Sequence, residues 1–150
     1  MGKPRDLRVR VYTSDPAVDF SSYFATAHLA ADEWTDVALP LWQFEASNAP
    51  SGWGSVHTVT LIAGPPEIPA APGAVLLDDI RLTKEPIDPV ILLGDDVTGW
   101  AHVTRSEEDP ADGAACADWG DPGQVPWIDT RRLPDDWSPY YKLSLSLWSA

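Results

Sequence analysis

Apolar and polar residues alternate along two segments that lie far apart in the chain. In residues 7–13 every second side chain from Leu7 onward would face one way, and in residues 141–148 leucines alternate with polar residues and Trp148. Successive side chains of a strand point to opposite faces, so each segment predicts a strand with one buried face. The opposite faces would carry Arg8, Arg10 and Tyr12 in the first strand and Ser144, Ser146 and Trp148 in the second.

Shorter extended segments fill the chain between these two strands. The 15 prolines are spread along the whole sequence and leave little room for long helices. The further predicted strands are residues 20–29 (where the alanines would also allow a short helix), 34–41, 57–62, 74–82, 90–93, 100–106, 114–119 and 127–132. The predicted loops include residues 47–54 and 64–73, and residues 83–89 are predicted to be a linker. About nine short strands at this spacing predict an all-β fold, an antiparallel two-sheet β-sandwich of the jelly-roll kind.

Length and charge narrow the classes of protein. The chain has 150 residues, of which 44% are hydrophobic, so we expect one folded domain over residues 1–150 rather than disorder. The net charge is −13. Nucleic acid and anionic membrane surfaces are therefore poor partners, whereas neutral ligands and cations remain possible. The sequence contains neither a visible signal peptide nor an apolar stretch long enough to span a membrane.

Reactive side chains are few and scattered. Cys116 is the one cysteine, so no disulfide can form within the chain, and its alanine-rich surroundings indicate a buried apolar residue rather than a nucleophile. The histidines have no metal-ligand spacing, and the adjacent Asp135 and Asp136 are not placed to face a common substrate. We therefore expect no catalytic site and no enzyme.

Four motifs are spread along the chain between residues 34 and 140. They are Gly-Asp-Asp-Val-Thr-Gly-Trp at 94–100, Asp-Trp-Ser-Pro-Tyr at 136–140, the Trp-led segment 34–41, and Leu-Asp-Asp-Ile-Arg-Leu at 77–82. In combination they resemble the galactose-binding-like β-sandwich modules attached to polysaccharide-degrading enzymes. The resemblance implies a non-catalytic, secreted carbohydrate-binding module whose partner is a polysaccharide or oligosaccharide.

The order of these motifs differs from that of the resembled modules. Residues 1–85 resemble the closing half and residues 86–150 the opening half, so the chain is either a circular permutant or a fragment of two tandem domains. We favour permutation, because the halves sum to one domain and residues 83–89 could bridge roughly 20 Å. It predicts that strands 7–13 and 141–148 are antiparallel neighbours with Met1 near Ala150. It also predicts that strands 74–82 and 90–93 lie close together in a monomer; a stiff linker would instead give a domain-swapped oligomer.

Aromatic side chains are the candidate sugar contacts, because their flat faces match the apolar faces of sugar rings. The chain has eight tryptophans, of which Trp34, Trp100 and Trp137 occupy framework positions of the resembled modules. If the two alternating strands pair, their polar faces combine into one sugar-binding surface; the alternative is a solvated face with arginines packed over aromatics. The predicted site comprises Tyr12, Trp148, Arg10 and Arg8, with Trp119 and Trp127 beside a turn as further candidates.

The acidic pairs suggest a structural calcium ion, because Ca²⁺ takes six to eight oxygen ligands. The resembled modules often hold such an ion between their first and last strands, which implies Asp78 with Asp95 and Asp96 as ligands. The alternative is that these residues form exposed acidic turns. For the whole chain, the rival to glycan binding is a structural or interaction domain without a sugar ligand; a further alternative is an engineered permutant or scaffold.

Overall fold

The computed structural model describes residues 5–63, 75–84, 87–108, 110–111, 113–120, 124–129 and 133–149. The predicted loop 64–73 and both chain ends, including Met1 and Ala150, lie outside the described residues. No helix in these ranges is long and apolar enough to cross a membrane.

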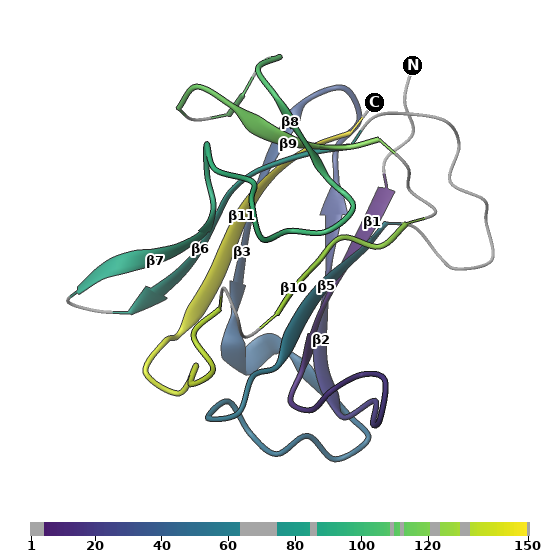
Figure 1. Cartoon of the computed structure of the whole chain (residues 1–150), viewed down its shortest axis with the longest axis vertical. Helices are drawn as coiled ribbons and strands as arrows, with labels where there is room; N and C mark the ends of the chain where they lie inside the picture. The colour runs from purple at the N-terminus through teal and green to yellow at the C-terminus, as the bar shows by residue number, and fades with distance from the viewer. Residues whose placement is uncertain are drawn as a thin grey trace.

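The described strands form two antiparallel sheets that pack face to face as a β-sandwich (Figure 1). Sheet A contains, in spatial order, β10 (Trp127–Asp129), β5 (Thr58–Ala63), β1 (Arg5–Tyr12), β2 (Ser22–Leu29) and β4 (Glu45–Ser47). Sheet B contains β3 (Trp34–Pro40), β11 (Lys142–Ser149), β6 (Val75–Lys84), β9 (Cys116–Trp119) and β8 (Thr104–Ser106), with β7 (Ile87–Leu93) paired to β6. The helical element of these ranges is a short 3₁₀ turn, η1 (Leu41–Gln43).

The core lies between the two sheets and follows the alternation seen in the sequence. Leu7, Val9 and Val11 of β1 are fully buried, and the leucines of β11 join the same hydrophobic cluster. The side chains between them point to the outer faces of the sandwich. Segments 20–29 and 57–62 are strands as predicted, and Cys116 is buried as expected.

The predicted pairing of the two alternating strands is wrong. β1 pairs with β2 and β5 in sheet A, whereas β11 pairs with β3 and β6 in sheet B. Alternation identifies which side chains of one strand share a face, but it carries no information on which strand lies beside it. The polar faces of the two strands therefore lie on opposite sides of the sandwich.

The predicted linker is a hairpin. β6 continues to Lys84 and β7 begins at Ile87, so residues 83–89 belong mostly to two paired strands. The expected proximity of segments 74–82 and 90–93 is confirmed, because Leu82 pairs with Val90. Strands of both chain halves pair with one another in each sheet, as β10 does with β5 and β11 with β3.

Three shorter elements also differ from the predictions. Segment 100–106 forms a strand only at Thr104–Ser106, because Trp100 turns inward and its Nε1 donates to Leu92 O at 2.8 Å. Of the predicted strand 127–132, Trp127–Asp129 is a strand, and residues 130–132 lie outside the described residues. β4 begins before the predicted loop 47–54 and adds a short edge strand beside β2, so the described strands exceed the predicted number.

The turn at 136–140 anchors the core at one end of the sandwich. Asp136 Oδ1 accepts hydrogen bonds from the amide and the hydroxyl of Ser138, at 2.9 and 2.6 Å, and both bonds lower the pKa of this carboxyl. The turn directs Trp137 into the core, where its ring stacks 6.1 Å from that of Trp53. The Trp53 ring in turn stacks 4.2 Å from Tyr23, so three aromatic side chains join the turn to sheet A.

Candidate functional site

The outer face of sheet A brings polar and aromatic side chains together in two rows. The first row runs from Trp127 through Thr60 to Arg10. The second runs from Asp129 through Thr58 to Tyr12. Each side chain points outward because its neighbours along the strand, such as Val59, Val11 and Ile128, point into the core.

A hollow of about 470 Å³ lies over these rows. It is lined by Tyr12, Asp15, Pro16, His57, Thr58, Thr60, His102, Val125, Trp127 and Asp129. The volume is within the range of roughly 300–1,000 Å³ that small-molecule sites occupy. The lining combines an indole and a phenol with hydroxyl, carboxylate and imidazole groups, so it can both bury an apolar face and bond polar groups at its rim.

Two histidines are held in fixed orientations at this hollow. His57 Nδ1 lies 2.7 Å from Thr58 Oγ1, and His102 Nδ1 lies 2.9 Å from the carbonyl oxygen of Val125. Because a carbonyl only accepts, His102 must carry a proton on Nδ1 in this contact. In its neutral form Nε2 of His102 is then an acceptor, which gives the wall a group that can accept from a ligand hydroxyl.

Arg8 and Arg10 lie over aromatic rings of the same face. The guanidinium carbon of Arg8 lies 5.2 Å from the centre of the Phe24 ring, and that of Arg10 lies 5.8 Å from the centre of the Tyr12 ring. These contacts match the alternative reading of the sequence, in which arginines pack over aromatics.

Three polar atoms of sheet A and one of sheet B, Asp118 Oδ1, are buried without a hydrogen-bond partner in the described residues. In the described part of the chain, Arg10 Nε, Thr60 Oγ1 and Ser22 Oγ are buried and have no hydrogen-bond partner. Most buried polar atoms in proteins are hydrogen-bonded, to protein, water or ligand. These atoms have almost no accessible surface, so a molecule on the outer face would reach them only after the side chains above them move.

The predicted site residues are divided between different parts of the molecule. Tyr12, Arg8, Arg10 and Trp127 share the outer face of sheet A, although only 8% of Tyr12 is exposed. Trp148 lies on the outer face of sheet B, where it pairs with Trp34. This placement follows from the pairing of β11 and removes Trp148 from the surface that Tyr12 helps to form.

The Trp119 side chain is not accessible to a ligand. Its side chain is fully buried in the core, and its Nε1 donates to Gln124 O at 2.7 Å. The sequence places Trp119 beside a turn, which suggested exposure, but its strand β9 lies between β6 and β8. We therefore leave Trp119 out of the candidate site.

The sequence interpretation missed Thr58, Thr60, His57, His102 and Asp129. Two of these could have been found, because Thr58 and Thr60 alternate with the apolar Val59 and Leu61 along a predicted strand. His102 and Asp129 reach the hollow only through tertiary structure.

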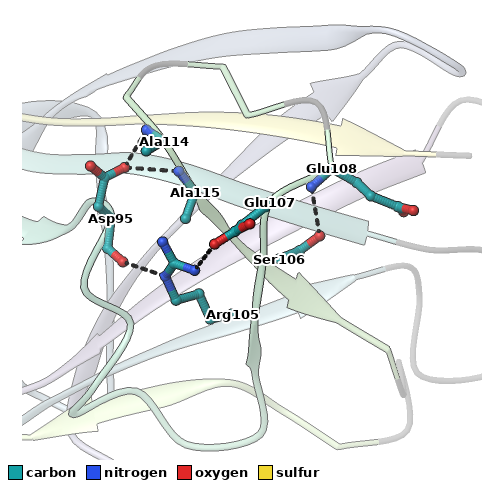
Figure 2. A network of polar contacts seen from close by, with 7 residues as sticks. All are labelled: Asp95, Arg105, Ser106, Glu107, Glu108, Ala114 and Ala115. Atoms are coloured by element: carbon teal, nitrogen blue, oxygen red, sulfur yellow. Dashed lines mark hydrogen bonds and ion pairs between the residues drawn. The ribbon is translucent and has the colours of Figure 1, made fainter.

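The acidic pair after β7 has a role in shaping loops. Asp95 Oδ1 accepts hydrogen bonds from the amides of Ala114 and Ala115 at 2.7 and 2.9 Å (Figure 2). Arg105 Nε donates to the backbone oxygen of Asp95, and its Nη1 pairs with Glu107. This network, seen from close by in Figure 2, ties the turn after β7 to the loop that precedes β9.

The predicted calcium ligands have structural partners of their own. Asp96 Oδ1 accepts from the amide and hydroxyl of Thr98, and Asp78 Oδ1 accepts from the amide of Asp79. In the described residues, no three His, Cys, Asp or Glu side chains come together as a metal site would require. Any cation held by Asp78 and Asp95 would need backbone carbonyls for most of its ligands.

The amides of Ala114 and Ala115 lower the pKa of Asp95 below its ordinary value of 3.8. A carboxyl whose pKa is lower in the folded state stabilises the fold above its unfolded pKa, and this contribution is lost as the pH falls through the folded value. We therefore expect Asp95→Asn to lower the melting temperature at neutral pH. In acid below the lowered pKa, Asp95 is itself protonated, so we expect the substitution to lower the melting temperature less. Thermal unfolding of both proteins at the two pH values measures this difference; an equal deficit at both would show that the charge has no part in it.

Comparison with known proteins gives no guide to function, so the fold and the site geometry are the basis for a proposal. No protein-family model, curated protein or solved structure gives a significant match to the chain.

Proposed function

We propose that this protein is a non-catalytic carbohydrate-binding module that binds a glycan on the outer face of sheet A. The observation that carries the proposal is the hollow of about 470 Å³ lined by Trp127 and Tyr12 together with hydroxyl, imidazole and carboxylate groups. A sugar ring has apolar C–H faces and a rim of hydroxyls, and both find matching groups here. The glycan would lie against the Trp127 indole, and its hydroxyls would bond to polar side chains that line the hollow, such as His102 and Asp129.

We further propose that the module is a circularly permuted relative of the galactose-binding-like family, from a secreted polysaccharide-active protein. The proposal rests on the four sequence motifs and on the pairing of strands from residues 1–85 with strands from residues 86–150 in sheet B. The turns at 94–100 and 136–140 each use an aspartate that caps the residue two positions on. Both turns lead a tryptophan, Trp100 or Trp137, into the core.

Binding is tested with the whole chain labelled with ¹⁵N. The probes are the hexasaccharides of cellulose, xylan, mannan and laminarin. We expect at least one of them to shift the indole N–H signal of Trp127, assigned by the loss of that signal in Trp127→Phe. If none of these sugars moves the Trp127 signal, the glycan site on sheet A is refuted and the structural or interaction domain becomes the better account.

A structural calcium ion remains part of this proposal, with Asp78 and either Asp95 or Asp96 supplying carboxylate oxygens. An ion that binds only the folded state stabilises it, so we expect the melting temperature to rise in millimolar calcium relative to EDTA. Magnesium at the same concentration is the control, because it prefers a smaller, octahedral site. Identical melting in all three solutions would argue against the ion and leave the two acidic pairs as loop-forming residues.

A further inference from the structure

The outer face of sheet B carries a second groove, which lies on the opposite side of the sandwich from the hollow of sheet A. Its volume is about 440 Å³. It is lined by Asp36, Val37, Ala38, Asp79, Arg81, Thr83, Lys142, Ser144, Leu145 and Ser146. The small side chains Ser144, Ser146 and Ala38 of adjacent strands form its floor.

Two tryptophans lie on the same outer face, two strand positions beyond Asp36 and Ser146 of the groove lining. Trp148 of β11 pairs directly with Trp34 of β3, and both are half-buried on the outer face. At the other end, Lys142 pairs with Pro40, and its Nζ lies 5.7 Å from the centre of the Tyr141 ring. Trp148 lies six strand positions after Lys142, so the groove and the tryptophans together span roughly 20 Å at about 3.3 Å per residue.

We propose that this groove is a second glycan-binding face, which takes a linear, uncharged stretch of polysaccharide. The proposal extends the proposed function to another surface and rests on it in part. The hydroxyls on the floor of the groove offer hydrogen bonds to successive sugar units, and the indoles beyond its end offer stacking.

The charges in the groove favour a neutral ligand. The two basic residues that line it, Arg81 and Lys142, are balanced by two acidic ones, Asp36 and Asp79. Arg81 Nε donates to Asp79 Oδ1 at 2.7 Å and its Nη2 contacts Asp79 Oδ2, while Ser146 Oγ donates to Asp36 Oδ1 at 2.6 Å. These contacts hold the side chains in position and leave no excess of one charge to attract an ionic partner.

The position of the groove on the face of sheet B argues against a peptide or a second copy of the chain as the occupant. A peptide that adds to a sheet needs an edge strand with unpaired backbone groups. In the described residues the edge strand beside the groove is β3, so an added peptide would lie next to β3 in the plane of the sheet and not over the groove. A partner at this groove must therefore bind through side chains, and the net charge of −13 opposes close contact between two copies.

Two binding faces would make the module bivalent. Because the sheets pack face to face, the two outer faces point away from each other, and one straight glycan chain cannot lie on both. The module would therefore link two chains of a polysaccharide or two regions of one particle, with the gain in apparent affinity that two tethered sites provide.

The experiment uses the same ¹⁵N-labelled chain and the same four hexasaccharides. We expect a sugar to shift the indole signal of Trp148, assigned through Trp148→Phe. We also expect Ser144→Met, which fills the floor of the groove, to weaken that response at least tenfold and to leave the Trp127 response unchanged. Thr104→Met is the matched control, because it places the same side chain on an exposed position of β8.

The outcomes separate the two faces. If the Trp127 signal moves and neither Trp34 nor Trp148 responds to any sugar, the second face is refuted and the first stands. If Trp148 responds and Trp127 does not, the second face stands alone. If no sugar shifts either the Trp127 or the Trp148 signal, both proposals are refuted. A Trp148 signal that shifts with protein concentration alone, together with a dimer in sedimentation, would assign the groove to self-association and overturn the proposal.

Discussion

Replacement of Trp137 by alanine is expected to lower the free energy of unfolding by about 3–5 kcal/mol. The Trp137 side chain is fully buried, stacks on Trp53, and donates from Nε1 to Pro134 O at 2.8 Å. Its removal leaves a cavity and an unpaired carbonyl, and the aromatic stack that ends at Tyr23 loses its support. Urea denaturation, followed by circular dichroism, measures the change.

Trp42 provides the control for this experiment. It lies in η1 and is 80% exposed, so Trp42→Ala should change stability by no more than about 0.5 kcal/mol. A loss at Trp137 that is no larger than the loss at Trp42 would mean that the core is not packed as described.

Replacement of Trp127 by alanine is expected to weaken binding to the responding hexasaccharide at least 30-fold, which is about 2 kcal/mol, the loss typical of a residue that dominates an interface. Trp127 belongs to the short edge strand β10 and is only partly buried, so its loss should leave the core intact. The two effects are separated by isothermal titration for affinity and urea denaturation for stability.

Tyr12 has to be treated differently from Trp127, because it is nearly buried under Arg10. Tyr12→Phe keeps the ring and removes the hydroxyl, so it tests a polar contact without opening the face.

The control for Trp127→Ala is again Trp42→Ala, which should bind as the wild type does. A Trp127→Ala protein that binds normally, or that unfolds as easily as Trp137→Ala, would show that Trp127 is not a sugar platform.

Strand positions could be predicted from the sequence because they follow from local periodicity. Residues 7–13 and 141–148 became β1 and β11 with small changes at their ends. The turn at 136–140 was also predictable, because an aspartate side chain often accepts a hydrogen bond from the backbone two residues further on, and this bond favours a turn. The sandwich class followed from the number and spacing of such segments.

The pairing of strands could not be predicted in the same way. β11 fits equally well beside β1 or beside β3 when only its pattern of apolar residues is considered. The choice depends on the packing of all strands at once, which no local pattern contains. The candidate site was divided for this reason, with Tyr12 and Trp127 on one side of the sandwich and Trp148 on the other.

Loop residues of the site were the hardest to predict. His102 has a positive φ of 63° and reaches the hollow through its bond to the Val125 carbonyl, 23 residues further along the chain. Asp95 similarly acts on amides 19 and 20 residues away. Side chains that bind across such distances leave no periodic signal in the sequence.

The position of β11 also has a consequence for how the chain acquires its structure. Asp36 and Ser146, which bond across β3 and β11, are 110 residues apart. β3 and β6 have no shared partner until β11 has been synthesised and inserted between them. Contacts of such long range slow folding to roughly milliseconds or seconds. While β11 is missing, the facing edges of β3 and β6 offer unpaired backbone groups to other chains, so sheet B is the part of the nascent protein most exposed to misassembly on the ribosome.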